Sequence, residues 1–391
     1  MKKKLLAGLC LSMIMSVSVF TGCGTGGSNT STTSQQTTMQ TETNSVPETT
    51  EAETTAASAV QEEELNAKKE ALREEFLAEA DKVEITEDSV IFQDASAEGA
   101  ATITVSKNPQ KVVNLYGSFT TLWYEAGGSV IGCIGGDSTV ELYNEYIGRD
   151  ITQDEGVTVV ATSSSGKKWD TETIVALQPD LIICSTAMSG YSTIQAPAQA
   201  AGIPVIAVSY NDFRDYLKSF KVFCNLNGQP ELWDSVAMKA LDEVVEVLAN
   251  CPTEDNPTVF SMFSGSESLQ ANTSNTVVGS MITAMNAHNI VDGWDNSTGA
   301  DRLEINLETV YLSDPDIIVV QCHAGAEEAQ KQVEELYGND AVWQSLKAVK
   351  EGRVYYLEKA LFHNKPNSRF AEAYQKLAEI LYPDVEIVSG N

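Results

Sequence analysis

The sequence predicts a two-lobed α/β protein whose parallel sheets are covered by helices, and three observations support this fold class. Short apolar runs of strand length alternate with amphipathic stretches along most of the chain, as expected for parallel strands connected by helices. A helical stretch, a Pro-Asp turn and an apolar run occur together twice, at 172–184 and at 308–320. Between the two copies, residues 230–249 carry apolar side chains at helical spacing and would form a rod of roughly 30 Å, long enough to join two lobes.

The N-terminal residues 1–22 have the composition of a secretory signal peptide. Three lysines precede an apolar run from Leu5 to Phe20, which is shorter than a membrane span and ends in small residues before Cys23. The ending Phe-Thr-Gly-Cys is similar to the bacterial lipobox, which implies cleavage before Cys23 and attachment of lipid to it. The alternative is plain secretion, with cleavage nearby and no lipid.

Two segments connect this leader to the folded part. Residues 23–60 are rich in Thr, Ser, Gln and Glu and hold almost no large apolar side chain, so they cannot bury enough surface to offset the entropy of ordering the chain. We predict a disordered tether. Residues 61–88 are charged and helical in composition, which favours a solvated helix packed on the domain edge; a coiled-coil contact with a partner is the alternative.

The first lobe is predicted at 89–229, the interlobe helix at 230–252 and the second lobe at 253–391. The expected strands of the two lobes are Lys111–Leu115, Val130–Ile134, Val157–Ala161, Leu181–Cys184 and Val205–Val208, then Thr258–Met262, Ile317–Gln321 and Val354–Leu357. A last helix is expected from about Ser368 to Leu381, because a proline precedes it and another follows it. Ligands of open α/β sheets bind at the carboxyl ends of the strands.

Charge and cysteine content exclude several classes of protein. The formal net charge is −30 at pH 7, which disfavours nucleic acid as a partner. Apart from the leader cysteine Cys10 and the candidate lipid-bearing Cys23, the cysteines are Cys133, Cys184, Cys224, Cys251 and Cys322. Their number is odd and no CxxC spacing occurs, so we expect neither a disulfide framework nor a zinc ribbon.

The sequence contains none of the common catalytic motifs that we considered. Residues 161–168 are superficially similar to a phosphate loop, but the first glycine and the hydroxyl residue after the lysine are missing. Neither GxSxG nor HExxH occurs. The only histidines are His288, His323 and His363, too few to favour a cage of several histidines around bare zinc or manganese. We expect a binding protein without catalysis and without a cofactor.

Six stretches together resemble the class III solute-binding proteins, which serve importers of ferric siderophores, heme, cobalamin and some oxyanions. The stretches are NPQKVVNL, VALQPDLIICST, AGIPVIAVS, LSDPDIIVV, WQSLKAVKEGRVYYL and KPNSRFAEAYQKLAEILYP, in this order between Val90 and Pro383. The resemblance implies two Rossmann-like lobes joined by a single long helix. It also implies a partner, the permease of an ABC importer with its ATPase.

The resemblance assigns a docking role to one glutamate on each lobe. Glu172 and Glu308 would contact arginines of the permease, and two carboxylates on separate lobes would fix the orientation of docking and speed the encounter. The structural alternative is that each acid only stabilises the dipole of its helix, behind Asp170 and Asn306 as caps.

The loops that follow the strands supply the candidate ligand-binding residues. These are Tyr116, Ser118, Ser165, Met188 and Tyr210 in the first lobe, and Ser264, Arg302, His323 and His363 in the second.

Three of these residue types suggest specific roles. Arg302 would hold an anionic oxygen as a permanently charged fork, unless it pairs with Asp301 or Glu304 at the surface. A neutral His323 would be an axial ligand of iron or cobalt, unless it is structural. Tyr116 and Tyr210 would stack on a macrocycle or bind ferric iron, unless they pack at a strand end.

The expected function is capture of a metal complex outside the cytoplasm by a monomer anchored through lipid on Cys23, at a Gram-positive type of cell surface. A ferric siderophore is expected first, then heme or a corrinoid such as cobalamin. Because a fold does not fix a function, an extracellular enzyme or a ligand-sensing lipoprotein on the same scaffold are the alternatives.

Overall fold

The computed structural model describes residues 49–95, 102–163, 168–266, 268–385 and 387. The chain divides into two units, residues 1–54 and 55–391, and the first is described only where helix α1 (Thr49–Leu77) begins. The signal peptide, Cys23 and Ser165 lie outside the described residues. Residues 49–60, which the sequence analysis assigned to the tether, belong to α1, in keeping with their content of Ala and Glu, which are good helix formers.

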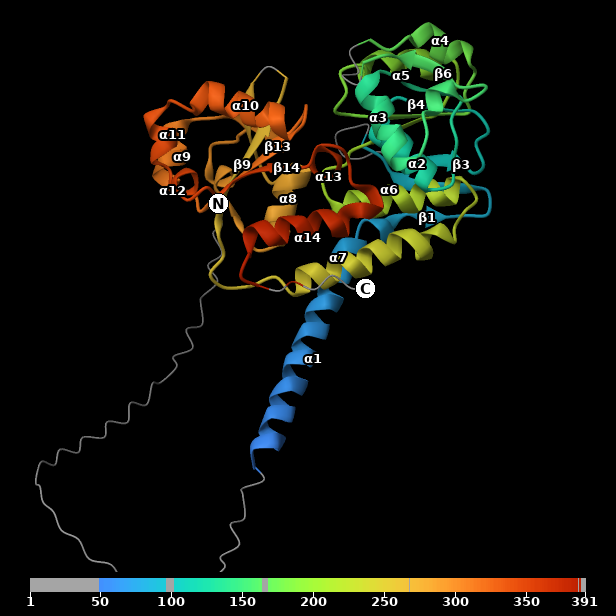
Figure 1. The fold of residues 1–391 in the computed structure, drawn as a ribbon. Helices are drawn as coiled ribbons and strands as arrows, with labels where there is room; N and C mark the ends of the chain where they lie inside the picture. Colours follow the sequence, from blue (N-terminus) through green and yellow to red (C-terminus); the bar gives the residue numbers. More distant parts are fainter. Residues whose placement is uncertain (1–48, 96–101, 164–167, 267, 386, 388–391) are drawn as a thin grey trace, which may run out of the picture. The chain divides into compact units, whose positions relative to one another are not determined.

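The first lobe is built on a five-stranded parallel sheet with the strand order β6-β5-β4-β7-β8. Its strands β4 and β6 and its helices α2 to α5 are labelled in Figure 1. The strands are β4 (Val112–Asn114), β5 (Gly132–Ile134), β6 (Thr158–Ala161), β7 (Leu181–Ser185) and β8 (Val205–Val208). The helices are α2 (Gly117–Glu125), α3 (Asp137–Tyr146), α4 (Thr171–Ala176), α5 (Tyr191–Ala200) and α6 (Phe213–Leu226). The order of the strands reverses between β4 and β7, which is where doubly wound sheets bind ligands.

The second lobe has a mixed six-stranded sheet with the order β12-β10-β9-β13-β14, and β11 pairs with β9. Its strands are β9 (Thr258–Ser264), β10 (Leu269–Asn272), β11 (His288–Asn289), β12 (Arg302–Glu304), β13 (Ile317–Cys322) and β14 (Val354–Leu357). Its helices are α8 (Val277–Ala284), α9 (Leu307–Ser313), α10 (Ala326–Tyr337), α11 (Ala341–Ser345), α12 (Lys347–Lys350) and α13 (Lys359–Phe362). Strands β10 and β12 run antiparallel to their neighbours.

A small antiparallel sheet that the sequence analysis did not predict precedes the first lobe. It consists of β1 (Glu84–Ile85), β2 (Ser89–Gln93) and β3 (Thr102–Ser106), and follows a 3₁₀ turn at Ala80–Lys82. Val90, Phe92 and Val105 are buried in the core. The helical segment expected to reach residue 88 therefore ends earlier.

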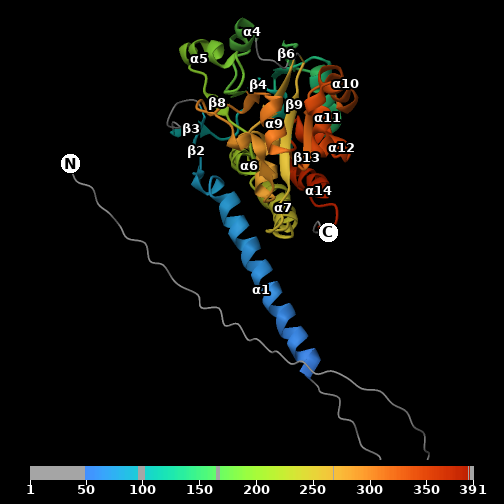
Figure 2. The same ribbon diagram turned by 90° about the vertical axis from the view of Figure 1, so that its left-hand side faces the viewer.

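A layer of helices joins the two lobes. The interlobe connection is a π-helical turn, Trp233–Met238, followed by α7 (Lys239–Ala249), and the last helix, α14 (Phe370–Leu381), lies alongside α7 (Figures 1 and 2). One buried apolar cluster includes residues of α6, α7 and α14 together with strands of both lobes. The lobes thus share a core.

Helix α1 is fastened to the interlobe helix by charged contacts. Lys68 Nζ donates to the carbonyl oxygens of Ala249 (2.8 Å) and Cys251 (3.2 Å) at the end of α7, where helix carbonyls lack partners. The packing on the domain edge that was expected for the helical segment 61–88 agrees with these contacts of Lys68.

The internal repeat has a structural counterpart in both lobes. Asp180 Oδ2 accepts hydrogen bonds from the backbone N–H groups of Gln110 and Lys111, just before β4. Asp316 Oδ2 accepts one from the N–H of Thr258, at the start of β9 (2.9 Å). The repeated Pro-Asp turn therefore tethers the start of a central strand in each lobe.

Candidate functional site

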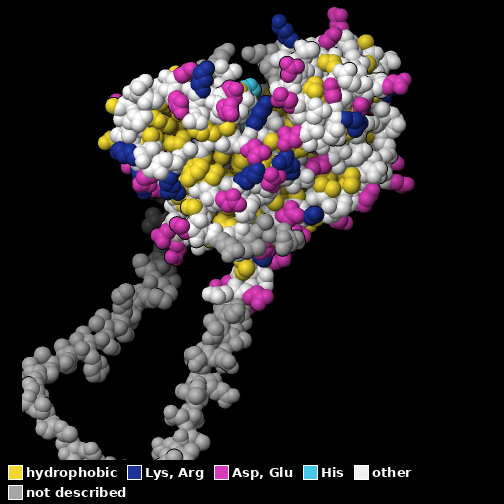
Figure 3. All heavy atoms as spheres, viewed as in Figure 1, with side chains coloured by type: hydrophobic (Ala, Val, Ile, Leu, Met, Phe, Trp, Pro, Cys, Tyr) yellow, Lys and Arg dark blue, Asp and Glu magenta, His cyan; other side chains and the backbone are white. Residues whose placement is uncertain are grey.

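The carboxyl ends of the strands of both lobes meet a segment, His363–Arg369, that passes from the second lobe to the first. Its backbone N–H at Lys365 lies 3.5 Å from Ser118 Oγ, and Asn367 Nδ2 donates to Thr121 Oγ1 at 3.1 Å. Figure 3 shows a histidine side chain with a cationic side chain beside it in the hollow between the two lobes. We call this region the crevice.

Arg302 is held in the crevice by uncharged groups. Its Nε donates to Asn272 Oδ1 at 3.0 Å, and its guanidinium carbon lies 4.0 Å from the centre of the Phe263 ring. Asn272 is fully buried and in turn donates to Gln321 Oε1 at 3.1 Å. Burial lowers the pKa of Arg302, and Asp301 and Tyr116 oppose the shift, but the group stays charged because its ordinary pKa is above 12.

Arg302 forms no ion pair within the described residues, so the expected surface alternative, a salt bridge with Asp301 or Glu304, is not what the structure shows. A half-buried guanidinium supported by amides and an aromatic ring keeps part of its donor fork for another group.

His323 and His363 form a pair beside Arg302. Nδ1 of His323 lies 3.0 Å from Nε2 of His363, and the rings are nearly perpendicular. Burial, and then the neighbouring His323 and Arg302, lower the pKa of His363 to about 3, and burial also lowers the pKa of His323. Both imidazoles are therefore neutral at pH 7. Nδ1 of His363 is buried without a hydrogen-bond partner in the described part of the chain.

The first lobe contributes Tyr116 and Ser118. Tyr116 precedes α2, and burial raises the pKa of its phenol while Ser118 and the positive charge of Arg302 oppose the shift. Tyr116 and Arg302, from opposite lobes, therefore lie close enough for the charge of Arg302 to act on the phenol. Since the phenol keeps its proton at neutral pH, Tyr116 can donate a hydrogen bond in the crevice.

Tyr210 is a core residue and supports the site from behind. It is almost fully buried, and its ring is stacked with Phe119 and Phe370 at centroid distances of 6.2 and 6.1 Å. Both faces of the ring are therefore covered, so Tyr210 packs at the end of its strand and does not stack on a ligand. Its carbonyl oxygen accepts a hydrogen bond from Lys365 Nζ.

Two further candidates lie at the ends of strands. Ser264 is buried at the end of β9, where its hydroxyl donates to Gln332 Oε1 at 2.5 Å. Met188 follows β7 and is half-buried against the apolar cluster of the first lobe.

Sequence reasoning missed the second cation of the crevice, Lys365. Burial lowers its pKa to about 8; Asp215 opposes the shift and Arg302 adds to it. The positive charges of Lys359 and Arg302 also help to lower the pKa of both histidines. Three cationic side chains thus act on one small region of a chain whose net charge is −30. The clue in the sequence was the lysine in KPNSR, which lies between the predicted strand Val354–Leu357 and the predicted last helix.

The two candidate docking glutamates are exposed in the first turns of equivalent helices. Asp170 Oδ1 accepts from the N–H of Thr173, and Asn306 Oδ1 from those of Glu308 and Thr309, so the predicted helix caps are confirmed. The carboxylates of Glu172 and Glu308 take part in neither cap, and both residues are exposed.

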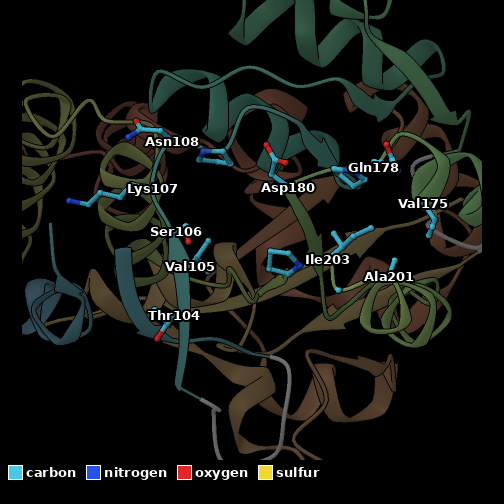
Figure 4. A pocket seen from close by; sticks show the side chains of 14 residues that line it. Thr104, Val105, Ser106, Lys107, Asn108, Val175, Gln178, Asp180, Ala201 and Ile203 are labelled. Carbon is cyan, nitrogen blue, oxygen red and sulfur yellow. The ribbon is translucent and has the colours of Figure 1, made fainter. Parts of the chain in front are cut away.

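A cavity of about 650 Å³ lies elsewhere in the described part of the chain (Figure 4). It is lined by β3 and by residues 107–109, 178–180 and 201–204, which precede β4, β7 and β8. It is therefore at the amino ends of the strands, away from the crevice, and Asp180 in its wall is already bonded to the backbone. Size alone does not make it the ligand site.

Within the described residues, the structure shows no disulfide and no cluster of side chains suited to a metal ion. The five cysteines are buried and unpaired there, and no group of three or more His, Cys, Asp or Glu side chains could hold a metal ion. In the same part of the chain, no helix combines the length and the apolar character needed to cross a bilayer.

Comparison with known proteins places the chain in one family. The family described as periplasmic binding protein matches residues 112–361. An uncharacterized ABC transporter substrate-binding lipoprotein of Bacillus subtilis, YvrC, is 25% identical over 304 residues, which cover 75% of this chain and 86% of the relative. The Fe(3+)-citrate-binding protein YfmC of the same organism is 25% identical over 257 residues, covering 64% and 74%.

A solved structure shows the same fold. The periplasmic catecholate-siderophore binding protein VctP of Vibrio cholerae superposes with a TM-score of 0.56 at 15% identity, over 75% of this chain and 99% of the other.

Proposed function

Because the chain belongs to the periplasmic binding protein family, we propose that it is the lipid-anchored substrate-binding component of an ABC importer and that it carries an anionic iron chelate. Family membership makes it a binding component of transport and not an enzyme. The observation that carries the choice of ligand is the cationic crevice in a strongly acidic protein. Arg302 and Lys365 form it, and Lys359, which pairs with Glu141 at 3.8 Å, adds a third positive charge nearby.

Charge in the crevice favours a negatively charged ligand for a physical reason. Arg302 is half-buried and forms no ion pair in the described part of the chain, so a bound anion would offset the cost of burying its charge. Carboxylate and catecholate oxygens match the planar fork of Arg302. Ligands with such oxygens are named for two similar proteins: ferric citrate for the Bacillus subtilis relative and a catecholate siderophore for the Vibrio cholerae protein.

The neutral histidine pair supports a metal complex over a bare oxyanion. A neutral imidazole offers a nitrogen lone pair to iron, and the unpartnered Nδ1 of His363 has this lone pair when Nε2 carries the proton shared with His323. We assign to His363 and His323 the inner contacts with the metal complex, and to Tyr116 and Ser118 hydrogen bonds from the first lobe. A ferric siderophore or ferric carboxylate is the first candidate and heme with its propionates the second, whereas a neutral corrinoid would not use the positive charges of the crevice.

Delivery would depend on the anchor and on the two exposed carboxylates. Lipid on Cys23 would keep the protein at the outer face of the cell membrane, on a tether long enough to reach the permease. Glu172 and Glu308 would dock on basic side chains of the permease, one for each lobe.

A thermal-shift panel at pH 7.5 tests the ligand assignment. It would compare ferric citrate, a ferric catecholate and heme with two neutral complexes, a ferric hydroxamate and cobalamin, and with iron-free chelators. A ligand at 100 times its Kd should stabilise the protein by about 2.7 kcal/mol. We expect stabilisation by one anionic ferric complex; stabilisation by neutral complexes alone would overturn the assignment.

A further inference from the structure

Helix α9 of the second lobe exposes two large apolar side chains beside a candidate docking carboxylate. Leu312 is 84% exposed and Tyr311 is 51% exposed. Leu312 is the most exposed large apolar residue in the described part of the chain. The same helix buries Val310 and packs Leu307 against the core of the lobe, so Leu312 is not needed to attach α9.

The apolar pair and the carboxylate share one face of the helix. Tyr311 and Leu312 follow Glu308 by three and four positions, and residues so spaced are neighbours on a helix surface. A molecule that reaches Glu308 would therefore also reach Leu312.

The first lobe lacks this apolar pair at the equivalent place. In the repeat, Glu308 corresponds to Glu172, while Tyr311 and Leu312 correspond to Val175 and Ala176. Ala176 is exposed but offers only a methyl group. The two lobes thus present the same charge with different apolar surroundings.

We propose that Tyr311 and Leu312 are an apolar contact for the permease on which Glu308 docks, and that they make the docking surface of the second lobe different from that of the first. The proposal rests on the docking role given to Glu172 and Glu308 above. Its occupant is an extracytoplasmic surface of the permease that offers a basic side chain to Glu308 and an apolar side chain to Leu312. Charged contacts speed the encounter, and a desolvated apolar anchor slows dissociation.

Binding to the permease complex in nanodiscs tests the proposal. Leu312→Ser should weaken that binding about tenfold or more, as loss of an interface anchor does, with an unchanged unfolding temperature and an unchanged Kd for the ligand. Leu336→Ser is the matched control, since Leu336 is 55% exposed on α10 of the same lobe, and should bind as the parent does. Parental binding by Leu312→Ser would overturn the proposal.

Two more substitutions, made together, distinguish failure of the apolar contact from failure of the docking role of the glutamates. If Glu172→Gln with Glu308→Gln weakens binding while Leu312→Ser does not, only the apolar contact is refuted. If neither change weakens it, the docking role fails as well. Two other occupants of the apolar pair are tested with the parent protein alone, by its binding to phosphatidylglycerol vesicles and by its dimerisation in sedimentation. If the parent shows either behaviour and Leu312→Ser loses it, the pair contacts lipid or a second copy, and the proposal is overturned.

Discussion

Nδ1 of His323 and Nε2 of His363 lie 3.0 Å apart, so one ring donates a hydrogen bond to the other inside the crevice. His323 follows β13 and His363 follows α13, so the fold of the second lobe sets their distance. The arrangement fixes both rings in place and keeps them uncharged near Arg302.

Replacing His363 with Gln should make the stability of the protein less sensitive to acid. The pKa of His363 is lowered to about 3 in the folded protein from an ordinary 6.5, so between these pH values only the unfolded chain takes up the proton. Stability therefore falls as the pH drops through this window, by at most about 1.4 kcal/mol per pH unit. Urea unfolding at pH 7 and pH 5 measures the effect. His288→Gln, at an exposed histidine, should behave as the parent, and equal acid sensitivity in all three proteins would refute the account.

Glu125→Gln should stabilise the protein above neutral pH. Burial raises the pKa of the Glu125 carboxyl to about 7, against a hydrogen bond from Ser368. At pH 8 the folded protein holds a buried carboxylate, and an amide would relieve a cost on the order of 1–3 kcal/mol. Because the cost arises between the unfolded pKa of 4.5 and the folded pKa of about 7, the gain should be clearly smaller at pH 5.5 than at pH 8. Thermal unfolding at both pH values decides this, with the exposed Glu155→Gln as control; a gain that does not depend on pH would contradict the assigned cause.

Much of the fold followed from the sequence, because buried parallel strands leave a strong local pattern. Every residue of β7 and β13 is buried, and both appear as continuous apolar runs. Strands β10 and β12 were missed because they are short and polar, and their pairing with β9 depends on residues far away in the chain.

The site was only partly predictable for the same reason. Arg302, His323 and Tyr116 stand next to strand ends or helix starts, so position alone suggested them. The contacts of Lys365 and Glu125 join opposite lobes and leave no local pattern. Tyr210 also follows a strand, yet its ring packs into the core, which a single sequence does not distinguish from an open site.

Cys23→Ala should release the protein from the membrane without unfolding it. The lipid would be attached far upstream of the folded lobes, and a flexible tether would keep the two thermodynamically separate. Cell fractionation should find the variant in the medium or the soluble fraction, with the parental unfolding temperature. Full retention in the membrane fraction would exclude lipid on Cys23 as the anchor.

Replacing both Glu172 and Glu308 with Gln should reduce uptake and leave capture intact. Both carboxylates are exposed on helices outside the crevice, so the Kd for the ligand should stay within roughly twofold while transport in cells or proteoliposomes falls. Glu155→Gln with Glu327→Gln, at two other exposed acids, is the charge-matched control. A parallel loss of ligand affinity would instead place the two acids in the ligand site.

The most direct test of the account is the equilibrium titration of Arg302→Gln and Lys365→Met with the anionic ferric chelate that stabilises the parent most. Removing a desolvated partner of a charge pair costs on the order of 2–5 kcal/mol, so the Kd should rise by at least about 30-fold in Arg302→Gln. Arg353→Gln, at a half-buried arginine before β14, should bind as the parent does. If Arg302→Gln and Lys365→Met also bind the chelate with the parental Kd, the cationic crevice is not where this protein holds its ligand.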